Sequence, residues 1–113
     1  MIVGQFLEEE DEAVIPVTLR GPDGREIEIT AVVDTGFTGS LTLPLQVVHD
    51  LGLPQGADEW ALLGDGSRTV LTTYEVSVVW DGRVRRITAY GVDGSALVGV
   101  RLLRGSLVTF EFI

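Results

Sequence analysis

A carboxylate, a hydroxyl and a glycine occupy three consecutive positions, Asp34-Thr35-Gly36, and this trio is the strongest candidate for chemistry in the sequence. A carboxylate held at a tight turn can take a proton from water, and glycine lets another backbone approach closely. The same residue types are also common in ordinary turns. The setting therefore matters: apolar residues 31–33 lead into the trio, and the alternating residues 40–43 follow it.

Other catalytic and metal-binding chemistries have few candidate residues. The chain contains no cysteine and no lysine, and His49 is its one histidine. These counts exclude disulfides, thiolate metal sites, thiol catalysis and multi-histidine metal sites within one chain. His49 falls on the exposed side of a predicted helix, and Gly64-Asp65-Gly66 lacks the lysine that a phosphate-binding loop requires. We therefore expect no metal and no cofactor.

The charge balance is strongly acidic, with 17 Asp and Glu against 8 Arg and a formal net charge of −9. Such a chain is poorly suited to neutralising phosphates, so nucleic acid is not an expected partner. The acidic residues 8–12 predict a solvated loop, because like charges repel inside a packed element. No basic-then-apolar leader and no membrane-length apolar run is visible. We expect a soluble, cytoplasmic protein with no membrane partner.

The elements that must position Asp34 are mainly strands. Residues 14–19 and 26–33 predict a hairpin around the turn at 21–24, and Asp34 directly follows the second arm. Asp81-Gly82 is a strong two-residue hairpin signal between two long strands. The further predicted elements are strands at 40–43, 60–63, 68–80, 83–92 and 107–113, a helix from Pro44 to a cap at Gly52, and a helical turn around 100–104 capped by Gly105.

A chain of 113 residues is long enough for one domain with its own core. Seven or so short strands and one or two short helices predict a single, mainly all-β domain over residues 1–113. The expected architecture is a compact closed barrel of short strands. Trp60 and Trp80 are expected in its core, with a substrate groove as the alternative location. Leu45, Val48 and Leu51 share the predicted buried face of the helix.

Taken together, these segments resemble the retropepsin-like aspartic proteases, in particular their short bacterial single-domain members. Residues 31–39 look like the catalytic turn, and residues 41–44 look like the strand that follows it. Leu97-Val98-Gly99 is similar to the apolar-apolar-glycine signature that precedes a short helix. The resemblance covers nearly the whole chain, and it implies an acid-protease fold with a flap whose tip is Leu63-Gly64-Asp65-Gly66-Ser67.

The resemblance implies an aspartic endopeptidase that hydrolyses peptide bonds with activated water. Asp34 would be the catalytic aspartate, Thr35 would anchor the active-site turns through its hydroxyl, and Gly36 would border the substrate. Because each chain carries one such trio, the second carboxylate must come from the other chain of a two-fold homodimer. The expected partners are a second copy of the chain and a peptide or protein substrate, over which the flap would close.

Two other functions stay open from the sequence. One is a noncatalytic dimeric retropepsin-like module that binds peptides or proteins, since a fold does not guarantee its chemistry. The other is a monomeric β domain in which Asp34 only caps a turn and the apolar ends close the barrel. Two residues depart from the family pattern: Phe37 stands where many retropepsins have a small residue, and Arg101 where an acidic or small polar residue is expected. Phe37 would either crowd the carboxylates or fill the core behind them.

Overall fold

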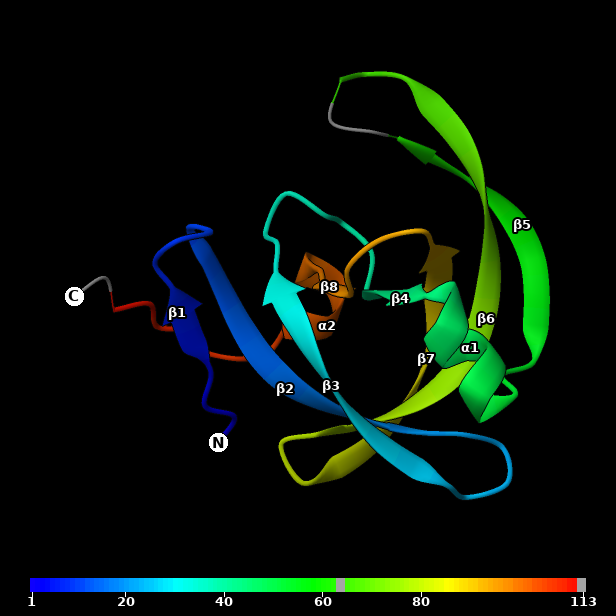
Figure 1. The fold of residues 1–113 in the computed structure, drawn as a ribbon, viewed down its shortest axis with the longest axis horizontal. Coiled ribbons are helices and arrows are strands. Elements are labelled where there is room, and N and C mark those ends of the chain that lie inside the picture. The colour runs from blue at the N-terminus through cyan, green and yellow to red at the C-terminus, as the bar shows by residue number, and fades with distance from the viewer. Residues whose placement is uncertain (63–64, 112–113) are drawn as a thin grey trace.

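The computed structural model describes residues 1–62 and 65–111, which form eight strands and two short helices (Figure 1). The predominance of strands agrees with the all-β prediction. In chain order the elements are β1 (Gln5–Leu7), β2 (Glu12–Arg20), β3 (Glu26–Val33), β4 (Leu41–Pro44), α1 (Leu45–Leu51), β5 (Gln55–Leu62), β6 (Arg68–Trp80), β7 (Arg83–Val92), β8 (Leu97–Val98) and α2 (Val100–Leu103).

The strands form one sheet in the order β1-β2-β3-β8-β4-β7-β6-β5. An additional antiparallel pairing of β2 with β6 closes six of these strands into a ring (Figure 1). The ring is barrel-like rather than a regular barrel, and β1 and β5 lie outside it. Two pairings are parallel, β3 with β8 and β4 with β7. The pairing of β3 with β8 brings the end of β3, where the Asp34 turn begins, beside residues 97–98.

The β2–β3 hairpin follows the predicted pattern. Gly24 adopts a φ of 86° in its turn, a conformation that glycine reaches without steric cost. Along β3, residues alternate between exposed and partly buried positions until Ala31, which is fully buried. The strand therefore turns inward as it approaches Asp34, and the candidate carboxylate stands at the point where the chain leaves the core.

The core fills the ring with aliphatic side chains from nearly every element. Its fully buried members include large residues from β2, β4, β6, β8 and both helices: Leu19, Leu41, Leu43, Leu51, Val78, Val98 and Leu102. Burying a leucine of this size contributes roughly 1.5–3 kcal/mol relative to leaving it exposed. The segments that flank the Asp34 turn, β4 and β8, are thus among the most deeply packed parts of the molecule.

The β6–β7 hairpin has the bounds that the sequence predicts, and its turn residues Asp81 and Gly82 have φ values of 50° and 82°. Strand β5 begins at residue 55, earlier than expected, and pairs with β6. The expectation that Trp60 is a core residue is wrong, because 68% of its surface is exposed on this edge strand. Trp60 instead has the Arg68 guanidinium 5.8 Å from its ring centre. Trp80, by contrast, is buried.

Helix α1 ends as predicted at Gly52, which adopts the left-handed conformation with a φ of 60°. The Gly52 backbone N–H donates to the carbonyls of His49 and Val48. Val48 and Leu51 are buried, whereas Leu45 at the start of the helix is 38% exposed, so the predicted buried face is one residue shorter. His49 is exposed, as expected from its position off that face.

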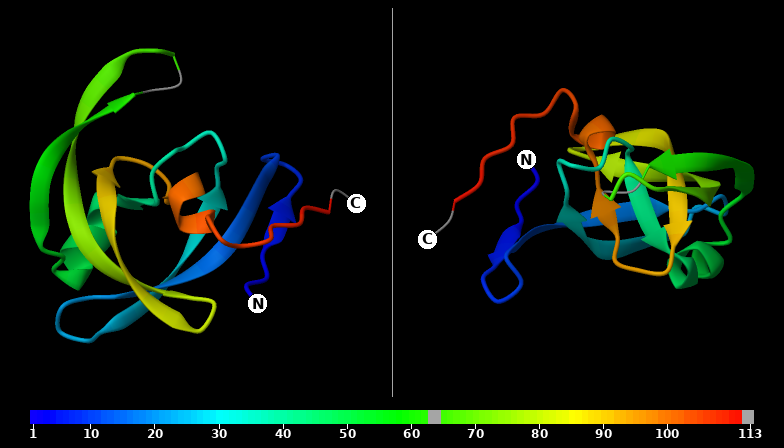
Figure 2. Two further views of the ribbon diagram at one scale, coloured as in Figure 1. Left: turned by 180° about the vertical axis from the view of Figure 1, so that it is seen from behind. Right: turned by 90° about the horizontal axis from the view of Figure 1, so that it is seen from above.

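The C-terminal end of the chain differs from the strand predicted at residues 107–113. Residues 106–111 form no strand, and the predicted positions 112 and 113 lie outside the described residues. A strand requires a ladder of backbone hydrogen bonds with a neighbour, and residues 106–111 belong to none of the ladders among the described strands. Strand β1 is short and pairs only with β2 among the described strands. Both ends lie on the same side of the molecule (Figure 2).

Candidate active site

Asp34 lies immediately after β3 and is partly exposed. Its backbone N–H donates to the Val98 carbonyl oxygen at 2.9 Å, which continues the parallel pairing of β3 with β8 by one residue. The carboxylate therefore projects from a rigid strand end rather than from a free loop. A group held in this way can keep a fixed direction toward a bound molecule.

The turn after Asp34 is closed by two hydrogen bonds to that residue. The Gly36 backbone N–H donates to Asp34 Oδ1 at 2.9 Å, and the Phe37 N–H donates to the Asp34 carbonyl oxygen at 3.1 Å. The first bond fixes the orientation of the carboxylate. A Cβ at Gly36 would lie 3.2 Å from Asp34 Oδ1, which is a tight contact, so the glycine suits this position. Thr35 is exposed at the apex of the turn.

The start of α2 clamps the segment that follows the turn. Three backbone N–H groups donate across this junction: Gly99 to Ser40 at 3.0 Å, Val100 to Phe37 at 2.9 Å and Arg101 to Gly39 at 3.1 Å. At Gly99 a Cβ would lie only 2.2 Å from the Gly39 carbonyl oxygen. The backbones can make these bonds only because residue 99 has no side chain. The structure thus brings together the two segments that the sequence singled out, 34–39 and 97–99.

Phe37 packs beside this clamp. Its ring lies close to Gly39 and Gly99, where an added Cβ would come within 2.6 Å of a Phe37 ring carbon in each case. The ring is also 6.2 Å from the Tyr90 ring, in a tilted arrangement. Phe37 therefore fills the space between the turn and β7, which is one of the two roles considered for it. Arg101 is exposed on α2.

Tyr90 connects the Asp34 region to β5. Its hydroxyl donates to Glu59 Oε2 at 2.9 Å, and Glu59 lies on the strand that leads toward the expected flap tip. Partial burial raises the pKa of the Tyr90 hydroxyl, and the neighbouring Glu59 carboxylate raises it further. Tyr90 therefore stays protonated and able to donate over the whole neutral range. Sequence reasoning missed this contact, because a single Tyr and a single Glu 31 residues apart give no local signal.

Tyr90→Phe tests whether this hydrogen bond restrains β5. We expect a small loss of stability, about 1 kcal/mol or less for an exposed bond, but faster amide hydrogen exchange in residues 57–62. Hydrogen exchange read by mass spectrometry measures the effect. Glu59→Gln is the matched control, since its amide oxygen still accepts the bond and exchange should stay close to that of the wild type. Unchanged exchange in Tyr90→Phe would show that the bond does not hold the strand.

The expected flap corresponds to the end of the β5–β6 hairpin, which projects beyond the ring (Figure 1). Leu63 and Gly64 of its predicted tip lie outside the described residues. In the described part, Asp65 Oδ1 accepts from the Ser67 N–H at 2.9 Å and from the Ser67 hydroxyl at 2.6 Å. These hydrogen bonds lower the pKa of Asp65. Gly66 has a φ of 87°, a conformation that glycine adopts without steric cost, so glycine suits this position.

Thr42 is a supporting residue that sequence analysis did not identify. It is 5% exposed, and its Oγ1 donates to the Ser95 carbonyl at 3.2 Å while accepting from the Leu97 N–H at 2.9 Å. These bonds fix the loop before β8 onto β4. The signal was present in the sequence as a single hydroxyl between two buried leucines, where an unpaired polar group would be costly.

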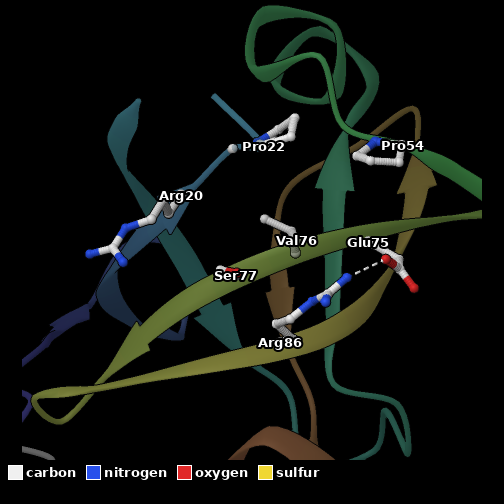
Figure 3. A pocket seen from close by; sticks show the side chains of 8 residues that line it. Arg20, Pro22, Pro54, Glu75, Val76, Ser77 and Arg86 are labelled. Carbon is white, nitrogen blue, oxygen red and sulfur yellow. Dashed lines mark hydrogen bonds and ion pairs between the residues drawn. The ribbon is translucent and has the colours of Figure 1, made fainter. Parts of the chain in front are cut away.

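Asp34 lines neither of two hollows on the surface. The smaller, of about 240 Å³, lies between the β2–β3 turn and β6, and the Arg86–Glu75 ion pair of 2.7 Å borders it (Figure 3). Within residues 1–62 and 65–111, no three His, Cys, Asp or Glu side chains are grouped to hold a metal ion. In a single chain Asp34 is partly exposed, so a second molecule can reach its carboxylate.

The fold has a counterpart among solved structures. It matches EIAV protease complexed with the inhibitor HBY-793, with a TM-score of 0.62 over 92% of this chain and 98% of that chain. The chain has a retropepsin-like fold. Sequence identity to EIAV protease is 16%, so the similarity shows the fold alone. Any catalytic activity must be argued from the residues of the site.

Comparisons of the sequence alone find no relatives of this retropepsin-like chain. No protein-family model matches it, and no curated protein matches its sequence. In the described part of the chain, neither helix has the length and apolar character needed to cross a membrane.

Proposed function

We propose that the protein is an aspartic endopeptidase, active as a homodimer in which Asp34 of each chain contributes to one active site. The observation that carries the proposal is the partly exposed Asp34 carboxylate, held in a fixed direction at the end of β3 by the clamp from β8 and α2. This arrangement occurs within a retropepsin-like fold and in an intact Asp34-Thr35-Gly36 trio.

The requirement for two chains follows from the chemistry. Hydrolysis of this type uses two facing carboxylates, and each chain offers one in this setting. A two-fold axis near Asp34 places each residue opposite its own copy, so the two carboxylates meet. At about 3 Å apart they cannot both ionise readily, and they share one proton. The dimer therefore creates an acid and a base from two identical residues.

The proposed reaction begins with water between the two carboxyl groups. The ionised carboxylate takes a proton from the water, whose oxygen attacks the peptide carbonyl carbon. The protonated carboxyl donates a hydrogen bond to the carbonyl oxygen and stabilises the charge that develops there. Transfer of a proton to the amide nitrogen then breaks the C–N bond. No metal or cofactor takes part in this scheme.

The other proposed site residues support these steps. Gly36 borders the substrate, and its N–H already fixes Asp34 Oδ1. Thr35 lies exposed at the apex of the turn, where its hydroxyl can meet the partner's turn. The hairpin end that includes Leu63, Gly64, Asp65, Gly66 and Ser67 would close over an extended peptide, offering backbone hydrogen bonds and excluding water.

The chain ends provide the proposed dimer surface. Met1 and Leu107 are 100% and 95% exposed, and Val3 is 71% exposed. Both ends lie on one side of the molecule (Figure 2), and we infer that their exposed apolar residues contribute to one dimer surface. Residues 106–111 belong to no strand within one chain. Pairing of this segment with the ends of a second chain would bury apolar surface and complete a ladder.

Leu107→Glu tests this dimer surface. Placing a charge in an apolar interface between two acidic chains should shift the dimer to monomers at micromolar concentration, with the monomer still folded. Light scattering gives the mass, and circular dichroism checks the fold. Leu62→Glu is the control, since Leu62 is similarly exposed on β5 and distant from the chain ends. If the wild-type protein is already monomeric, the result would instead favour the alternative of a monomeric β domain in which Asp34 only caps a turn.

The proposed activity is tested by incubating the protein with a diverse peptide mixture from mildly acidic to neutral pH. Mass spectrometry of the products identifies the cleaved bonds. We expect internal cleavage at a restricted set of sequences, with activity that rises with the fraction of dimer. A confirmed dimer that cleaves no peptide would favour the noncatalytic binding module, and the Asp34 variant described in the Discussion separates this enzyme from a contaminating protease.

A further inference from the structure

The larger of the two hollows lies at the end of the ring beside the β6–β7 turn and the segment after α2. It has a volume of about 420 Å³, within the range of small-ligand sites. Seven residues line it, and three of them are arginines: Trp80, Asp81, Arg83, Arg85, Arg104, Gly105 and Ser106. The chain has 8 arginines and a net charge of −9, so three of its cationic side chains meet in one place on an acidic protein.

These three arginines differ in their partners from Arg20, Arg25 and Arg86. Arg20, Arg25 and Arg86 each form an ion pair with a carboxylate, whereas in the part of the chain that the structure describes no carboxylate lies within 4.0 Å of the guanidinium nitrogens of Arg83 or Arg104. The same holds for Arg85, whose Nη1 donates to the Leu102 carbonyl at 3.0 Å and so binds the end of α2. Arg83 and Arg104 are exposed.

The acidic side chain in this hollow is already engaged. Asp81 Oδ1 forms an ion pair with the amino group of Met1. The hydroxyl oxygen of Ser106 accepts a hydrogen bond from Trp80 Nε1 at 3.3 Å, which leaves the hydroxyl proton available for another acceptor. The hollow therefore presents guanidinium and hydroxyl donors, and its carboxylate is paired with an amino group. Such a set of donors can bind an oxyanion through charge-assisted hydrogen bonds, whereas it offers no comparable interaction to a cation or a neutral apolar group.

We propose that the hollow bordered by Arg83, Arg85, Arg104 and Ser106 binds a compact oxyanion with two or more negative charges. Guanidinium groups recognise carboxylate and phosphate oxygens through paired N–H donors, so a phosphate group and the carboxylates of an acidic peptide share the required chemistry. The protein's overall negative charge opposes approach of any anion, so binding depends on these short-range contacts rather than on a general field. This site is independent of the proposed peptidase activity.

The test uses the full-length wild-type chain at low salt and two probes, inorganic pyrophosphate and a triglutamate peptide. Isothermal titration calorimetry measures affinity for each probe. We expect saturable binding of at least one of them, and the stronger of the two identifies the source of the oxyanion. Arg83→Ala and Arg104→Ala should each weaken that binding about tenfold, the loss expected for a charge-assisted hydrogen bond. Both residues are exposed, so the fold should survive, as circular dichroism will check.

Two controls separate a built site from general attraction. Arg68→Ala removes the same charge from the β5–β6 hairpin, away from the hollow, and should leave affinity unchanged. Arg104→Lys keeps the charge but removes the planar pair of donors, so it should weaken binding nearly as much as Arg104→Ala. Failure of both probes to bind up to millimolar concentration would overturn the proposal. Binding that Arg68→Ala weakens as much as Arg104→Ala does would overturn it too.

Discussion

Asp34→Asn is expected to abolish peptide hydrolysis and to leave the fold and the dimer intact. The substitution keeps an oxygen that can accept from the Gly36 N–H, so the turn of residues 34–37 retains its hydrogen bonds. It removes the ionisable group from both halves of the proposed site, so neither chain can take the proton from water. Loss of general acid–base catalysis alone lowers rates roughly 10²–10⁴-fold, and removal of both groups places activity below detection.

The measurement compares wild type and Asp34→Asn on the same peptide mixture, prepared identically so that a contaminating protease would appear in both. Asp50→Asn is the matched control, because Asp50 is an exposed carboxylate on α1 that accepts from Gln46 at 2.8 Å, and Asn preserves that bond. Asp50→Asn should cleave like the wild type. Cleavage by Asp34→Asn at the wild-type rate would remove Asp34 from the mechanism.

Gly99→Ala is expected to be the most destabilising of the small substitutions near the site, by about 3 kcal/mol or more. The φ of Gly99 is −102°, which alanine adopts easily, so the cost comes from contacts rather than from backbone strain. The new Cβ would stand 2.2 Å from the Gly39 carbonyl oxygen and 2.6 Å from the Phe37 carbonyl oxygen. Both obstacles are backbone atoms that cannot rotate away, so the clamp around the Asp34 turn must open.

Urea denaturation followed by circular dichroism measures this loss as a lower midpoint. Gly94→Ala is the matched control, since an added Cβ there has no heavy atom within 4 Å and its stability should change little. In protein that remains folded, we expect Gly99→Ala to lose peptidase activity as well, because the carboxylate loses its fixed direction. A midpoint equal to that of Gly94→Ala would contradict the close approach at residue 99.

The elements that local patterns define were predictable. The bounds of β3, β6 and β7 match the expected ranges because each strand is delimited by glycine turns. The same is true of the end of α1 at Gly52, where a left-handed residue is required. In these segments the hydrophobic period and the turn residues indicate the same structure, so no tertiary information is needed.

The features that depend on distant partners were not predictable from such patterns. Trp60 is a large apolar residue of the kind that often packs in a core. Its strand, however, lies at the edge of the sheet, where the side chain is exposed to solvent. Residues 107–111 alternate like a strand, yet they belong to no strand among the described residues, because a strand also needs a ladder with a neighbouring strand. Sequence periodicity indicates which face of a segment can be buried, but it does not show whether a neighbouring strand is present to pair with it.

The candidate site likewise contains residues that were predictable from the sequence and residues that were not. The Asp34-Thr35-Gly36 trio was identified from its residue types and the Leu97-Val98-Gly99 segment from the family resemblance, and the two lie together in the structure. The groups that support them, the Thr42 hydroxyl and the Tyr90–Glu59 hydrogen bond, join residues far apart in sequence. The position of Thr42 between two leucines hints at a supporting role, but the partners of its hydroxyl and of the Tyr90 phenol emerge only once the topology is known.

The clamp on the Asp34 turn also has a consequence for when the site can form. It joins residues 34–40 to residues 98–101, so it requires closure of a loop of about 60 residues. During synthesis the aspartate emerges long before the segment that orients it, and contacts of such long range form late in folding. In a growing chain the Asp34 carboxylate therefore has no fixed orientation until α2 has been synthesised and has packed against the turn. The proposed peptidase would remain inert toward its own nascent copies and toward its neighbours on the ribosome until folding is nearly complete.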